Sequence, residues 1–173
     1  MINSIVNIFR EQAREHKCIK SFYYNRNYEL GSGSEAHPLF WLEDPVSGRN
    51  QSNLFVNSVN FSILFLPGND NEIVKFQDLA FSIGLNILER IKQNEKSISI
   101  LPTWTYVTLR NYYDNNACGC RFSVDFTQLN MQDLCLIDEQ FDDEKQFYEE
   151  DNLYTHQVFA DKLPEFNLKT LRR

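Results

Sequence analysis

The chain has 173 residues, of which 42% are hydrophobic, and a formal net charge of −7, which fits one folded domain with or without an extension. Its N-terminal apolar stretches are too short and too polar for a signal peptide or a membrane span, so we expect a cytoplasmic protein with reduced cysteines and no membrane partner. Residues 1–132 carry 12 basic and 13 acidic side chains, and residues 133–151 carry one basic and nine acidic side chains. Residues 152–173 carry four basic and two acidic side chains. This distribution of charge argues against a broad nucleic-acid surface.

The first quarter of the chain predicts one helix and two short strands. Apolar residues recur at helical spacing in residues 2–16, with charged residues between them, which indicates an amphipathic helix. The aromatic-rich residues 18–30 and the apolar residues 37–44 predict strands, separated by a flexible break at residues 31–36. Residues 45–53 are rich in polar residues and predict a loop.

A longer strand and a long helix follow. Residues 54–67 alternate with a period of two, and their second face becomes apolar near the end, so we expect a strand whose last part is buried on both faces. Asn69 and Glu72 have the spacing of a capping box, which predicts a helix that runs to about Gln93. Gly84 in the apolar stripe of this helix predicts close packing against another element. The stripe consists of Ile73, Phe76, Ala80, Ile83, Ile87 and Ile91.

The last regular elements are predicted to be a strand pair. Residues 98–113 form a strand region that Pro102 interrupts, residues 114–119 form the turn, and residues 120–126 return as a strand. The alternation of this return strand places Cys118 and Cys120 on one face with Phe122, Val124 and Phe126. The predicted core residues are Phe61, Ile63, Ile83, Ile87, Cys118, Cys120, Phe122 and Val124.

The two closely spaced thiols are expected to be small apolar core side chains. Cys118 and Cys120 are separated by one residue, so they lack the C-x-x-C spacing of a redox pair. A zinc site would need Cys18 or Cys135 and a fourth ligand, which no second Cys or His pair supplies. We therefore expect no metal.

No familiar catalytic constellation is visible in the sequence. His16, His37 and His156 occur singly, outside any Ser/His/Asp or Cys/His setting. The glycine-rich phosphate-binding motifs and the zinc-protease motif are missing from the sequence. We therefore expect no enzymatic activity and no cofactor.

The acidic run at residues 138–152 has two interpretations. It lacks the alternation and central glycine of a calcium-binding loop. It is either a solvated acidic segment, mobile in the free chain, or an arm that docks onto a neighbouring subunit through its aromatic side chains. The candidate anchors of such an arm are Phe141, Phe147, Tyr148, Tyr154 and Phe159.

The element order resembles the tail-terminator family of tailed phages, whose members form rings at the head-proximal end of the tail. The resemblance covers roughly residues 2–127 and lies in the long helix "NEIVKFQDLAFSIGLNILERIKQ" and the late hairpin "TYVTLRNYYDNNACGCRFSVDF". The Asn-rich turn followed by an alternating strand is similar to proteins of phages of Bacteroides-type hosts, including crAss-like phages. The chain differs from a minimal terminator by an extension of about 45 residues, which comprises residues 128–173.

The resemblance implies an α+β fold with a mixed or antiparallel sheet of about four or five strands, packed by the N-terminal helix and the long central helix. It divides the chain into a ring-forming domain, residues 1–127, and an assembly arm, residues 128–173. It implies a structural virion protein of the neck or tail that is made in the host cytoplasm. Its partners would be six or twelve copies of itself, neighbouring neck, portal or tail-tube proteins, and DNA held without sequence preference in the ring lumen. The alternative function is a cytoplasmic adaptor or accessory binding protein without catalytic activity.

Overall fold

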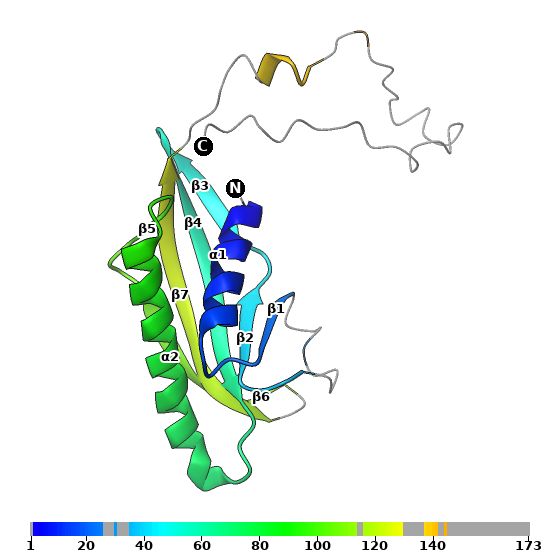
Figure 1. The fold of residues 1–173 in the computed structure, drawn as a ribbon, viewed down its shortest axis with the longest axis vertical. Coiled ribbons are helices and arrows are strands. Elements are labelled where there is room, and N and C mark those ends of the chain that lie inside the picture. Colours follow the sequence, from blue (N-terminus) through cyan, green and yellow to red (C-terminus); the bar gives the residue numbers. More distant parts are fainter. Residues whose placement is uncertain are drawn as a thin grey trace, which may run out of the picture. The chain divides into compact units, whose positions relative to one another are not determined.

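The computed structural model describes residues 2–25, 30, 35–113, 116–129, 137–141 and 144. The chain divides into two units, Met1–Leu129 and Asn130–Arg173. The first unit is an α+β fold in which two helices cover one face of a seven-stranded mixed sheet (Figure 1). Its elements are α1 (Ile2–Glu15), β1 (Ser21–Asn25), β2 (Leu39–Glu43), β3 (Ser47–Gln51), β4 (Leu54–Phe65), the 3₁₀ turn η2 (Asp70–Glu72), α2 (Ile73–Asn94), β5 (Ser99–Ile100), β6 (Thr105–Tyr112) and β7 (Ala117–Leu129).

The seven strands occupy five positions across the sheet, because two positions are each filled by a pair of consecutive strands. β2 and β3 pair antiparallel with the same edge of β4, on either side of a break at residues 44–46. β5 and β6 pair antiparallel with the same edge of β7, on either side of a break that contains Pro102. β1 pairs parallel with β2, which makes the sheet mixed. The predicted four or five strands therefore correspond to these five positions.

β4 and β7 form the centre of the sheet, and all twelve residues of β4 have a partner on β7. The last five residues of β4 are buried, as the apolar second face predicted. A row of stacked aromatic rings crosses the helix-facing side of the sheet. The rings of Phe40 and Phe61 lie 5.1 Å apart and those of Phe61 and Phe122 lie 4.9 Å apart, each pair tilted by only 9°. Phe9 of α1 packs on this row, with its ring 5.5 Å from that of Phe61.

The predicted stripe of α2 faces the sheet. Five of its six members are buried, and Phe76 is partly buried and stacks on Phe65 with a ring separation of 5.0 Å. Gly84 lies against Phe122, and a Cβ atom at position 84 would be 2.2 Å from Cε2 of that ring. The prediction that Gly84 marks close packing is therefore confirmed, because any side chain there would push the helix away from β7.

The opposite face of the sheet carries a smaller apolar cluster and a polar network. Leu39, Trp41, Leu64 and Ala117 are buried there together with Leu30, and Tyr112 and Tyr113 pack against them. Neither α1 nor α2 covers this face (Figure 1). Neither of the two described helices has the length and apolar character that crossing a membrane requires.

Three local predictions were wrong in part. Residues 47–51 form β3 although they are all exposed, because main-chain pairing with β4 and not burial holds them in a strand. The predicted turn at residues 114–119 is shorter, since β7 already begins at Ala117. The carboxylate of Glu72 accepts a hydrogen bond from the backbone N–H of Gly68 at 2.8 Å, whereas a capping box would use that of Asn69.

We predict that Gly84→Ala destabilises the domain, although alanine favours helix formation. The added methyl group meets the Phe122 ring, and overpacking of this kind costs about 1–3 kcal/mol. The exposed Asn86 provides the control on the same helix, where Asn86→Ala should be neutral or slightly stabilising. Urea unfolding of both variants measures the difference, and a Gly84→Ala variant as stable as the parent would contradict the packing described here.

Candidate functional site

The two thiols singled out in the sequence lie in the helix-facing core. Cys118 and Cys120 are each fully buried, and so are Phe61, Ile63 and Phe122 around them. Burial raises the pKa of the Cys120 thiol to about 11, and burial together with the charge of Glu72 raises the pKa of the Cys118 thiol. Both thiols are therefore protonated at neutral pH, a state that neither attacks disulfides nor binds metal well.

Gly119 explains why a glycine separates the two thiols. A Cβ atom at this position would be 1.9 Å from the backbone oxygen of Ile63 on β4. The close approach of β4 and β7 therefore excludes any larger residue. Within the described part of the chain, no group of three or more His, Cys, Asp or Glu side chains is placed to hold a metal ion.

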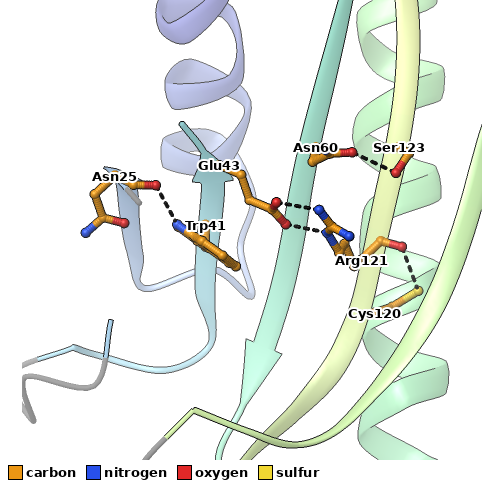
Figure 2. Close-up of polar contacts among 7 residues, drawn as sticks. All are labelled: Asn25, Trp41, Glu43, Asn60, Cys120, Arg121 and Ser123. Carbon is orange, nitrogen blue, oxygen red and sulfur yellow. Dashed lines mark hydrogen bonds and ion pairs between the residues drawn. The ribbon is translucent and has the colours of Figure 1, made fainter. Parts of the chain in front are cut away.

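The open face of the sheet carries a polar network that links three strands (Figure 2). The Arg121 guanidinium on β7 donates two hydrogen bonds, of 2.5 and 2.6 Å, to the carboxylate of Glu43 on β2, and the pair spans β4. Only 13% of the Glu43 side chain and 35% of the Arg121 side chain are exposed, so the pair is partly shielded from solvent. The hydrogen bonds that the guanidinium donates to Glu43 raise the pKa of Arg121.

Two further hydrogen bonds extend this network along β4 and β7. The Ser123 hydroxyl donates to the Asn60 side chain at 2.7 Å, and the Ser58 hydroxyl donates to the Asp125 carboxylate at 2.6 Å. These groups satisfy one another, so we assign the network to fixing the register of the strands and not to catalysis.

A second polar contact joins two segments that are distant in the sequence. Nδ1 of His37 lies 3.1 Å from the backbone oxygen of Glu35, and Nε2 lies 2.7 Å from the hydroxyl of Tyr113. A carbonyl oxygen can only accept, so Nδ1 carries the proton and Nε2 accepts from Tyr113. Burial lowers the pKa of His37, and burial with the charge of Glu35 raises the pKa of Tyr113 to about 12. His37 thus acts as a neutral connector beside the smaller apolar cluster.

One edge of the sheet exposes large apolar side chains. Six of the eight residues of β6 are exposed, including 56% of Tyr106 and 51% of Val107. Among the described residues β6 pairs only with β7, so its other edge has no strand partner. The Tyr106 ring packs on Phe81 of α2 at 4.6 Å, which holds that side chain in place at the edge.

A basic groove lies at the other side of the sheet, where α1 ends and β1 begins. It has a volume of about 310 Å³ and contains the cationic side chains of Arg10, Arg14 and Lys20. Arg10 and Arg14 are one helical turn apart, so both project from the same side of α1. The remaining lining residues are Ala13, Ile19, Ser21 and Phe22.

The structure brings the predicted core residues together but describes few of the predicted arm anchors. All eight predicted core residues are buried. Phe141 is 76% exposed and ends a turn in which its backbone N–H donates to Asp138. The other four anchors, Phe147, Tyr148, Tyr154 and Phe159, lie outside the described residues.

The basic groove is a surface feature that the sequence does not predict as a site. Helical spacing predicts only that Arg10 and Arg14 lie on the polar face of a helix, and it does not connect them with Lys20. The signal was present in the spacing of the two arginines, but their proximity to β1 depends on the fold. No protein-family model and no curated protein matches the chain.

We predict that Arg121→Met lowers the free energy of unfolding by about 2 kcal/mol, because it leaves the largely buried Glu43 carboxylate without its bidentate donor. Glu43→Gln in the same chain should recover part of this loss by removing the uncompensated charge. Urea unfolding of the parent, both single variants and the double variant measures the coupling. Strictly additive losses would show that the two side chains do not depend on each other.

We predict that the protein loses stability as the pH falls below about 6.5, the ordinary pKa of histidine. The folded-state pKa of His37 is lowered, so the unfolded chain binds the proton more readily and full stability is present only above this pH. His16 contributes in the same direction, since burial and the charge of Arg90 lower its pKa. His37→Gln should reduce the decrease in melting temperature between neutral and mildly acidic buffer.

Tyr113→Phe is the matched control for this measurement. It removes the hydrogen bond to His37, at a cost of about 1 kcal/mol, but leaves the imidazole buried. This variant should therefore melt lower at neutral pH and keep the dependence on pH. An unchanged pH dependence in His37→Gln would mean that other groups cause the acid sensitivity.

Proposed function

We propose that this protein is a structural subunit that assembles with copies of itself into a closed ring in the neck or tail of a tailed phage. The observation that carries the proposal is the exposed edge of β6. Exposed strand edges pair readily with other chains, and natural proteins usually protect them with charges, prolines or covering segments. β6 contains one charged residue, Arg110, and no proline, and it exposes Tyr106 and Val107.

The two sides of the sheet differ, which favours a ring over a symmetric dimer. β5 and β6 form one side. The other side is formed by β1, which is partly buried along its whole length, and by β3, whose five residues are exposed. A contact between two unlike surfaces leaves one of each free on every new complex. Such heterologous contacts generate rings when the rotation between copies closes.

The resemblance of the sequence to tail terminators supplies the setting of the proposed ring. That resemblance rests on the order of a helix, about three strands, a long helix and a strand pair, whereas the chain has four strands between α1 and α2 and three after α2. The tail-terminator-like fold remains part of this proposal. Six or twelve copies, with neck, portal or tail-tube proteins as neighbours, follow from the resemblance alone. The ring lumen would pass DNA without gripping it, because residues 1–132 are almost neutral.

We predict that the full chain forms a closed ring in electron micrographs and a defined oligomer in native mass spectrometry. Val107→Lys, which places a charge on the exposed β6 edge, should shift the population to smaller species at the same protein concentration. Asn86→Lys adds the same charge to an exposed site on α2 and should leave the oligomer unchanged.

Two results would contradict the proposed function. A parent chain that remains monomeric at all concentrations tested would favour the adaptor or accessory binding protein. Tight, sequence-specific DNA binding in a shift assay at ordinary salt would contradict a passive lumen.

A further inference from the structure

We propose that the basic groove between α1 and β1 binds the acidic segment, residues 138–151, of a second copy of the chain. This inference rests on the proposed ring, because it names one of the contacts that would join its subunits. It assigns a role to the three cationic side chains that line this groove, Arg10, Arg14 and Lys20.

The charges of the two surfaces are complementary. Residues 138–151 contain eight acidic side chains and one basic side chain. In the groove, Arg14 forms an ion pair with Glu11 at 3.6 Å, but 70% and 61% of the two side chains are exposed. Exposed pairs of this kind contribute little, so Arg14 can exchange Glu11 for an incoming carboxylate at small cost.

The groove also offers an apolar floor for an aromatic side chain. Ala13, which is buried and small, lines the groove together with Ile19 and Phe22. The Arg10 guanidinium lies over the Phe22 ring at 5.4 Å from its centroid, so a cation and an aromatic face are already combined there. The volume of about 310 Å³ suits one or two side chains and not a folded element.

The acidic segment carries matching aromatic residues among its charges. Phe141, Phe147 and Tyr148 are interleaved with the carboxylates. Phe141 exposes 76% of its surface, which is a large apolar area. An aromatic side chain of the segment that enters the groove would bury this apolar area. The carboxylates on either side of it would then lie beside Arg14 and Lys20.

A second copy is the occupant that best fits the assembly. Ring closure requires two different surfaces on every subunit that complement each other. The groove and the acidic segment are such a pair, and both are present in every chain. Their opposite charges would also disfavour groove-to-groove and segment-to-segment contacts, which selects the direction of assembly.

Zero-length crosslinking of mixed light and heavy protein tests this contact. Full chains with ¹⁴N and with ¹⁵N are mixed, and a carbodiimide couples amines to carboxylates that lie in direct contact. We expect crosslinked peptides that join Lys20 to an acidic residue of 138–151, with one light and one heavy member. Arg10→Glu combined with Arg14→Glu should abolish these pairs, because like charges then repel the segment.

The matched control is Lys75→Glu combined with Lys92→Glu, which reverses two exposed charges on α2 outside the groove and should leave the crosslinks unchanged. Thermal melting of both double variants verifies that they remain folded. Crosslinks that persist in the groove variant, that occur only between members of equal isotope, or that do not form at all would overturn the proposal.

The size of the assembly is measured separately, so the groove and the ring can fail independently. Rings without crosslinks at Lys20 would overturn the groove contact and leave the proposed function in place. Mixed-isotope crosslinks in small, open oligomers would support the groove contact and contradict the closed ring.

Discussion

The fit of Gly84 on α2 against the Phe122 ring on β7 is the constraint on which the first unit depends. The ring stacks in turn on Phe61, so one contact fixes both the distance between helix and sheet and the central aromatic row. The thiols of Cys118 and Cys120 lie on the same strand and face, where the helix must approach closely. Their small size is therefore a packing requirement, and their raised pKa values follow from it.

The two faces of the sheet are stabilised by different kinds of interaction. The face toward the helices is a continuous apolar core, whereas the open face is joined by hydrogen bonds and by the pair of Glu43 with Arg121. Ser58, Asn60 and Ser123 have side-chain partners on a neighbouring strand, whereas the buried hydroxyl of Ser62 has no hydrogen-bond partner among the described residues. The surfaces to which we assign interactions, the β6 edge and the groove beside β1, both lie at the margins of the sheet.

Sequence patterns predicted the elements that bury side chains. They failed where main-chain pairing, or contact between residues distant in the sequence, determines the structure. The period of β7 placed Cys118, Cys120 and Phe122 on one face correctly, because a half-buried strand must alternate. The polar residues of β3 gave no such signal, since nothing in that strand is buried. The contact between His37 and Tyr113 joins residues 76 positions apart, and no local pattern encodes such a pair. The basic groove is equally non-local, because it forms only when β1 lies beside α1.

The break between β5 and β6 limits what the sheet edge can template. Uninterrupted rows of backbone amides promote fibril growth, in which identical chains stack without end. Here the row is divided at residues 101–104, where Pro102 has no N–H group to offer. β6 itself is regular only from Thr105 to Leu109, because its register with β7 shifts between Leu109 and Tyr112. The interruption at Pro102 therefore shortens the row of amides that a second chain could extend.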